Sequence, residues 1–130
     1  MSRYVLDSFA LLTVLELQRG MDRVTELIDE AQVGSVELHM SAINLVEVRY
    51  HIIRRGKNTK DNEAAIKVLP VSVASADAYL EQVAELEARY PISLADCFCA
   101  ALAMDLDCPV VTGDPEFRKL ESILQVEWLR

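Results

Sequence analysis

The chain of 130 residues has the length of one ordinary domain, and its hydrophobic content of 52% is enough to build a buried core. It has only 4 glycines and 4 prolines and no repetitive segment, which excludes a disordered or low-complexity chain. The net charge of -8 normally counts against nucleic acid as a partner. We therefore expect a single domain over residues 1–130, in which any nucleic-acid site must overcome this charge locally.

Cysteine usage and hydropathy predict a cytoplasmic protein. The 3 cysteines are odd in number, lie in apolar surroundings and lack the paired spacing of zinc sites, so we expect reduced core thiols. The longest apolar run, residues 97–104, is far shorter than the roughly 20 residues that span a bilayer. Asp7 and Glu16 flank the first apolar stretch, which does not fit a signal peptide. The sequence therefore predicts no membrane segment and no export.

The first half of the chain alternates between strands and helices. Short β-branched and apolar runs indicate strands, and apolar residues at spacings of three and four indicate helices. The helix over residues 8–20 is apolar on nearly every side, so we expect it to be deeply packed and closed by Gly20. In chain order, the predicted elements are a strand at 3–7, helices at 8–20 and 21–34, a strand at 36–40 and a helix at 42–56 capped by Ser41.

The second half continues the alternation after the polar segment at 57–63, which we expect to be a loop. The predicted elements are a short helix through Leu69, a strand at 71–73, a helix from Ser75 with Tyr79, Leu80, Val83 and Leu86 on its inner side, a central alanine-rich helix from Ser93, and strands at 109–112 and 126–129. Parallel strands need helical crossovers. We therefore expect an α/β fold, with a parallel sheet of about five strands flanked by helices.

Four carboxylates stand near the ends of these elements. They are Asp7 at the end of the first strand, Glu47 on the helix capped by Ser41, Asp96 in the first turn of the alanine-rich helix, and Asp114 after the strand at 109–112. Each also has a simpler explanation. Asp7 and Asp114 can cap helices, Asp96 can pair with a capping Ser93, and Glu47 can be a solvated acid. The choice between helix cap and metal ligand is clearest at Asp114, which follows a strand and precedes Pro115 in the first turn of a helix.

Taken together, these acids predict a metal site. Glu47 and Asp96 fall among apolar residues, where a lone buried carboxylate is costly. Gathering carboxylates raises their pKa values by mutual repulsion, which a hard divalent cation relieves. Oxygen ligands without a His or Cys cluster favour Mg²⁺ or Mn²⁺ over zinc. We therefore expect metal-assisted phosphodiester hydrolysis, in which the cation also offsets negative charge where the substrate phosphate docks.

Neighbouring residues fit this interpretation. Asn44, Glu47 and Arg54 share one face of the predicted helix. Arg54, Arg55 and Lys57 belong to the most basic local stretch, and we expect it to contact substrate phosphate, with a solvated helix end as the alternative. Thr112 points to the same side of its strand as Asp114. We expect it to hydrogen-bond a ligating carboxylate or water, although an ordinary strand threonine is equally compatible with the pattern.

The chain resembles the PIN-domain ribonucleases, and among them the compact toxins of VapBC-type toxin–antitoxin pairs. The segment "YVLDSFALL" is similar to the opening strand of the family with its first acid, Asp7, followed by the hydroxyl residue Ser8. The segment "SAINLVEV" is similar to the one that supplies the second acid, Glu47, with the polar Asn44 ahead of it.

The most specific similarity lies in "LADCFCAALAMDLDCPVVTGDPEF". It resembles the third acid of the family, Asp96, on an alanine-rich helix, followed by a strand, Thr112, the fourth acid Asp114 and Phe117. These motifs occur in the order and spacing of the family over almost the whole chain. Phosphatases of the haloacid dehalogenase type fit less well, because they need a second aspartate where this chain has Phe9.

The resemblance implies a Rossmann-like PIN fold, an endoribonuclease that depends on Mg²⁺ or Mn²⁺, a homodimer and a small antitoxin partner. It places Asp7, Glu47, Asp96 and Asp114 in the metal site. Two departures occur: Phe9 replaces a small or polar residue, and Glu116, a candidate ligand for a second metal, stands where an aspartate is common. The alternative function is a non-catalytic PIN-like module that binds RNA or protein.

The high content of apolar residues also raises the question of a dimer surface. Leu11, Leu12, Leu15, Val24 and Leu27 lie on helix faces that form either a self-complementary patch or part of the core, and the sequence leaves both open.

Overall fold

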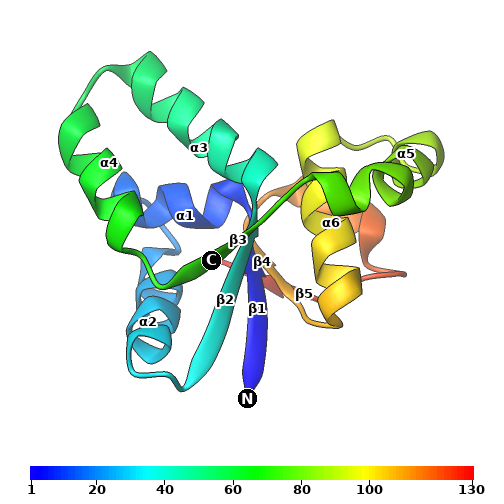
Figure 1. The fold of residues 1–130 in the computed structure, drawn as a ribbon, viewed down its shortest axis with the longest axis horizontal. Coiled ribbons are helices and arrows are strands. Elements are labelled where there is room, and N and C mark those ends of the chain that lie inside the picture. Colours follow the sequence, from blue (N-terminus) through cyan, green and yellow to red (C-terminus); the bar gives the residue numbers. More distant parts are fainter.

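The computed structural model describes residues 1–130 as a single α/β domain built on a five-stranded parallel sheet (Figure 1). The strand order is β3-β2-β1-β4-β5, and every neighbouring pair is parallel. The strands are β1 (Ser2–Leu6), β2 (Val36–Ser41), β3 (Val71–Ala74), β4 (Val110–Thr112) and β5 (Val126–Trp128). The predicted fold class, a parallel sheet of about five strands flanked by helices, is confirmed.

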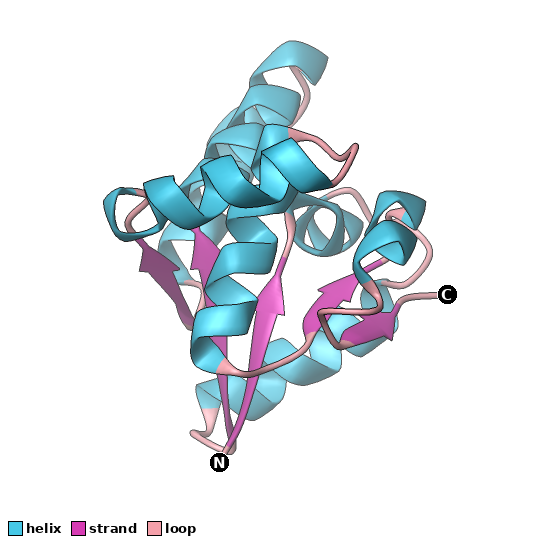
Figure 2. Ribbon diagram, turned by 90° about the vertical axis from the view of Figure 1, so that its right-hand side faces the viewer, coloured by secondary structure: helices cyan, strands magenta, loops and turns pink.

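Helices cover both faces of the sheet, as Figure 2 shows. Helices α1 and α2 pack on one face, and α5 and α6 lie on the other, while α3 and α4 extend beyond the sheet (Figure 1). The helices are α1 (Ser8–Leu15), α2 (Met21–Gln32), α3 (Ala42–Arg55), α4 (Thr59–Val68), α5 (Leu80–Arg89) and α6 (Leu94–Leu106). Two 3₁₀ turns, η1 (Asp77–Tyr79) and η2 (Pro115–Leu120), complete the chain. No helix is both long and apolar enough to cross a membrane.

Both faces of β1 are buried because helices cover both sides of the sheet. Val5 packs into the core formed with α6, and the next residue, Leu6, packs into the core formed with α2. Helix α6 is buried along most of its length, and its alanines Ala100, Ala101 and Ala103 are almost fully inaccessible to solvent. The prediction of a central alanine-rich helix is confirmed.

The predicted serine caps form as expected. The Ser41 hydroxyl accepts a hydrogen bond from the Ile43 backbone N–H at 3.2 Å, which fixes the start of α3. The Ser93 hydroxyl accepts one from the Asp96 backbone N–H, also at 3.2 Å, at the start of α6. These caps set the positions of the acids that follow them on each helix.

The first helix ends earlier than predicted. Helix α1 stops at Leu15, and Leu17 adopts a left-handed conformation with φ of 53°. The Gln18 backbone N–H bonds to the Thr13 carbonyl at 2.7 Å, which closes the helix as a Schellman motif without glycine. Leu17 is 76% exposed, so the expectation of a deeply packed helix over 8–20 is wrong at its end.

Two further sequence predictions are corrected. The segment 57–63, predicted as a loop, contains the start of α4, because its polarity marks an exposed helix face and only Ile66 of this helix is buried. Leu80, predicted on the inner side of its helix, is 55% exposed because α5 begins at Leu80 after a 3₁₀ turn, which changes the face that it presents.

The residues considered for a dimer patch lie mostly in the core. Leu11, Val24 and Leu27 are at most 1% exposed, and Leu12 and Leu15 are partly buried against the core cluster that contains Leu11. The patch is therefore explained by folding of the single chain. The three cysteines, Cys97, Cys99 and Cys108, are buried free thiols, as predicted.

Candidate active site

The sheet topology brings two of the predicted acids together. Strand β1 lies between β2 and β4, so the chain leaves β1 in one direction and later returns to its other side. Ligands in open parallel sheets bind at such a switch point, outside the carboxyl ends of the strands. Asp7 directly follows β1 and Asp114 follows β4 by two residues, which places both acids at this point.

Asp7 is held rigidly and is only 1% exposed. One carboxylate oxygen, Oδ1, caps α1 by accepting a hydrogen bond from the Ala10 backbone N–H at 2.8 Å. The other, Oδ2, accepts a hydrogen bond from the Thr112 hydroxyl. Asp7 thus serves as the helix cap that its position allows, and it also points toward β4.

Thr112 links the first acid to the fourth. Its hydroxyl, which donates to Asp7, also accepts a hydrogen bond from the Asp114 backbone N–H at 2.9 Å. Asp114 in turn caps η2, with Oδ1 accepting from the Glu116 backbone N–H at 3.0 Å. The predicted hydrogen bond from Thr112 to a site carboxylate is present, and Thr112 is fully buried.

Glu47 reaches the site from α3. The Ser8 hydroxyl donates to Glu47 Oε1 at 2.9 Å, and the Asn44 side-chain amide donates to the same oxygen at 3.3 Å. The Asn44 amide also donates to the Ala95 carbonyl at 3.3 Å, which ties α3 to the start of α6. These contacts connect the three supporting residues expected from the sequence, Ser8, Asn44 and Thr112, to the acids.

Asp96 lies in the first turn of α6 and is 7% exposed. Burial raises its pKa to about 6, and the negative charges of Asp114, Glu47 and Glu116 act in the same direction, against a hydrogen bond involving Ser93. Each of these three carboxylates is therefore close enough to act on Asp96.

Burial also raises the pKa of Asp7, to about 7. The hydrogen bonds from Thr112 and Ala10 partly offset this rise, whereas the charges of Asp96 and Asp114 add to it. A carboxyl with a pKa of about 7 is partly protonated near neutrality, and strongly perturbed acids of this kind cluster at functional sites.

The acids do not form a ready-made site for a divalent cation. No three Asp, Glu, His or Cys side chains are placed so that they could hold a metal ion together in their present conformations. The chemistry of the donors is nevertheless that of a hard cation, because all are oxygens and their charges repel one another. In addition, the Asn44 Oδ1 atom is buried without any hydrogen-bond partner, so this oxygen is free to coordinate a cation.

Glu116 lies at the edge of this group. It contributes to the raised pKa of Asp96, but its carboxylate forms an ion pair with Lys119 Nζ at 2.9 Å. This ion pair uses Oε2 of Glu116.

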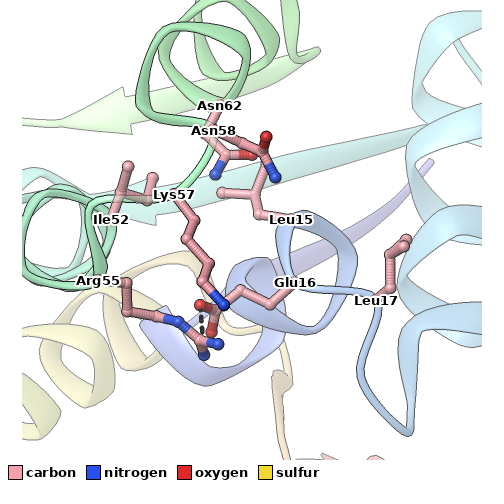
Figure 3. A pocket seen from close by; sticks show the side chains of 8 residues that line it. All are labelled: Leu15, Glu16, Leu17, Ile52, Arg55, Lys57, Asn58 and Asn62. Atoms are coloured by element: carbon pink, nitrogen blue, oxygen red, sulfur yellow. Dashed lines mark ion pairs between the residues drawn. The ribbon is translucent and has the colours of Figure 1, made fainter.

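The predicted basic residues, Arg54, Arg55 and Lys57, lie at the C-terminal end of α3 and just beyond it. Arg55 pairs with Glu16 at 2.8 Å, and Arg54 donates to the Tyr50 hydroxyl at 2.8 Å. Arg55 and Lys57 line a cavity of about 160 Å³ between the ends of α1 and α3 and the start of α4 (Figure 3). None of the three basic side chains bonds to the four acids.

Gly113 was not among the predicted site residues, although it separates Thr112 from Asp114. A Cβ atom at this position would lie 2.3 Å from Cε1 of Phe9 and 2.6 Å from its Cζ. The Phe9 ring therefore rests on the backbone beside the fourth acid. The sequence signals were an aromatic residue two positions after the first acid and a glycine just before the fourth.

Comparison with known proteins assigns the chain to a family. The PIN domain model matches residues 4–123. A chain of VapBC2 from Rickettsia felis, solved bound to a promoter DNA fragment, has a TM-score of 0.73 at 20% identity, covering 98% of this chain and 99% of that one. For VapBC-1 from nontypeable Haemophilus influenzae, the TM-score is 0.69 at 21% identity, with 97% of each chain covered.

The comparison with curated protein sequences gave no match. The structural similarities, at these low identities, concern the fold. The family match spans most of the sequence, from β1 to beyond η2, and includes all four acids. The chain belongs to the PIN domain family.

Proposed function

We propose that this chain is a metal-dependent endoribonuclease that hydrolyses RNA phosphodiester bonds and acts as the toxin of a type II toxin–antitoxin pair. The proposal is supported mainly by four acids whose charges act on one another, Asp7, Glu47, Asp96 and Asp114. They come from strand ends and helices that are far apart in sequence, at the carboxyl ends of the central strands. PIN domains are generally nucleases, which supports this assignment.

In this proposal, the four acids hold Mg²⁺ or Mn²⁺, with Asp7 and Asp96 as the principal ligands. When bound, the cation would polarise the phosphodiester and lower the pKa of the attacking water. Because the acids do not form a closed ligand set as they stand, the proposal requires side-chain rotation when the cation binds. Asp114 and Glu47 are the partly exposed members and are the ones with room to rotate.

The protein groups position these acids. The Thr112 hydroxyl and the Ala10 N–H fix the two oxygens of Asp7, so this carboxylate is oriented before any ligand binds. Ser8 and Asn44 direct Glu47 toward the site from α3. Near neutral pH, burial keeps part of the Asp7 population protonated, and this proton must leave before the carboxylate can bind a cation.

The partners are proposed from the structural neighbours. Several similar structures are VapBC complexes, so we infer a small antitoxin as partner, and an arginine inserted among the carboxylates would compete directly with metal. Homodimer formation and a cytoplasmic location belong to the same proposal, the latter in keeping with the three free thiols.

A second candidate is a non-catalytic PIN-like module that binds RNA or protein. One observation favours it, because the acids do not form a ready-made metal site. The raised pKa values of Asp7 and Asp96 favour the nuclease, since a module without catalysis gains nothing from buried, mutually repelling carboxyls.

The test is RNA cleavage by purified protein with and without a chelator. The proposal predicts cleavage that depends on Mg²⁺ or Mn²⁺, is abolished by EDTA and is lost in Asp7→Asn. The matched control is Asp22→Asn, because Asp22 is an exposed acid in the first turn of α2. Cleavage that survives in Asp7→Asn would assign the activity to a contaminant or to other residues.

A further inference from the structure

Phe9 is an aromatic side chain fixed at the edge of the acid group. It is the second residue of α1 and directly follows Ser8, which bonds to Glu47. Phe9 is 38% exposed, whereas Leu11 of the same helix is only 1% exposed. An apolar ring beside a group of carboxylates contributes nothing to holding a cation, so its place needs another explanation.

The glycine at position 113 makes this location possible. Any side chain at position 113 would run into the Phe9 ring, since the ideal Cβ position lies 2.3 Å from Cε1. The ring therefore packs against the backbone between Thr112, which bonds to Asp7, and Asp114. Its contact with Gly113 restricts the ring, and a restricted aromatic group loses little entropy when a ligand stacks on it.

We infer that Phe9 stacks on a nucleobase of single-stranded RNA next to the phosphate at the acid group, which makes Phe9 a substrate-positioning residue. This inference rests on the proposed function and names one contact of its substrate. Stacking on aromatic side chains is the common way in which proteins hold unpaired bases, and it works with any base.

The charge of the protein supports an uncharged contact. A chain with net charge -8 attracts a polyanion poorly, and the arginines of α3 already have partners, Glu63 for Arg49, Tyr50 for Arg54 and Glu16 for Arg55. Stacking adds affinity without positive charge. A base held on Phe9 would place its adjoining phosphate over the carboxylates that are proposed to hold the cation.

The first experiment compares cleavage kinetics of Phe9→Leu, Phe9→Tyr and wild type on a single-stranded oligoribonucleotide with Mn²⁺. Loss of the ring in Phe9→Leu should raise KM by about tenfold or more with little change in kcat, and Phe9→Tyr should behave like wild type. Tyr90→Leu is the control, because it removes a ring that lies near Met104, at the other end of α6 from Asp96.

The second experiment uses the contact with Gly113. Gly113 does not have a positive φ, so alanine is compatible with its backbone, but its methyl group must displace the Phe9 ring. Gly113→Ala should therefore raise KM as Phe9→Leu does, and the double variant should show little further loss. Additive losses in the double variant would overturn the assignment of the ring to this contact.

The third experiment separates base from backbone contacts in the inactive Asp7→Asn background. Binding of oligoadenylate and of an abasic strand of equal length should differ clearly when Phe9 is present. In Phe9→Leu the ratio of the two affinities should fall toward one. An unchanged ratio, or an unchanged KM with only a lower melting temperature, would show that the ring serves folding or a protein contact and would overturn the inference.

These outcomes are distinct from failure of the proposed function. If wild type cleaves RNA and Asp7→Asn does not, the nuclease assignment stands whatever Phe9 does. If wild type neither cleaves nor binds RNA under any metal condition, the proposed function and this inference fall together.

Discussion

Thr112 connects two of the acids, Asp7 and Asp114, through one side chain. Its single hydroxyl donates to Asp7 and accepts from the Asp114 N–H, and it is fully buried between them. A buried polar group that loses its partner retains the cost of its desolvation. Replacing this hydroxyl would therefore leave one acceptor and one donor without a partner.

Thr112→Val is expected to lower both stability and metal affinity. Loss of the two hydrogen bonds should cost about 1–3 kcal/mol in urea unfolding, and loss of an outer contact to a ligand should weaken Mn²⁺ binding by about 10- to 100-fold. Thr112→Ser keeps the hydroxyl and is the control. If Thr112→Val bound Mn²⁺ as tightly as Thr112→Ser, the hydroxyl would have no role in orienting Asp7.

The raised pKa of Asp7 gives a prediction of stability against pH. Its pKa is about 7 in the folded protein and 3.8 in the reference state, so the native state binds more protons between these values. Metal-free stability should thus fall as pH rises from about 4 to 7, by on the order of a few kcal/mol from this group.

Asp7→Asn removes this titration while keeping an oxygen that can cap α1. The variant should therefore be more stable than wild type at slightly alkaline pH, and the difference should shrink as pH falls toward 4. Urea unfolding in the presence of a chelator at both ends of this range measures it. A variant that is less stable than wild type throughout would show that the Asp7 carboxylate is not strained by burial.

At this scale, the sequence predicts the roles that depend on local position. The caps at Asp7, Ser41, Ser93 and Asp114 follow from residue type and helix start. The contact between Phe9 and Gly113 does not, because it joins residues about a hundred positions apart through three-dimensional packing. The left-handed conformation of Leu17 could not be predicted either, since sequence patterns assign that conformation to glycine or asparagine.

Among the elements, α3 carries two kinds of chemistry on one helix. Glu47, one of the four acids, and Asn44, which bonds to it, lie near the start of α3. Arg54 and Arg55 lie at its end, roughly 10 Å further along the helix axis. The cavity at that end includes Lys57, which forms none of the ion pairs in the structure (Figure 3). If RNA extends along α3 from the acids, this end would meet a distant phosphate.

Lys57→Ala tests that path. If Lys57 contacts one phosphate, the variant should bind RNA more weakly and reduce the slope of log affinity against log salt by about 0.7, the value for one contact to a single strand. Lys67→Ala is the control, because Lys67 is an exposed lysine at the other end of α4. Equal slopes for both variants would remove Lys57 from the substrate path.

Element boundaries are where sequence patterns succeed least. The existence and order of all five strands follow from short β-branched runs between helices. Helix α4 begins earlier than the short helix predicted to run through Leu69, because its first residues are polar and resemble a loop; Ile66 is its one buried residue. Likewise, the 3₁₀ turn before α5 shifts the buried face away from Leu80.

For the whole molecule, topology decides the site. The strand order places the ends of β1 and β4 side by side, and α3 and α6 then approach the same edge through the bond between Asn44 and the Ala95 carbonyl. Sequence order predicts the parallel α/β class, but the adjacency of Asp7 and Asp114 depends on a strand order that alternation alone does not determine. The prediction that these acids share one site comes from the chemistry of the carboxylates and from the family resemblance, and not from the alternation of strands and helices.

The central claim is that acids from separate elements of one chain bind a divalent cation. Its most direct test is a titration of metal-free protein with Mn²⁺, followed by electron paramagnetic resonance, for wild type, Asp7→Asn, Asp96→Asn and the exposed control Asp22→Asn. We predict saturable binding by wild type and Asp22→Asn, and affinity at least about tenfold weaker in the two site variants. Absence of binding by wild type, or equal binding by all four proteins, would contradict the account.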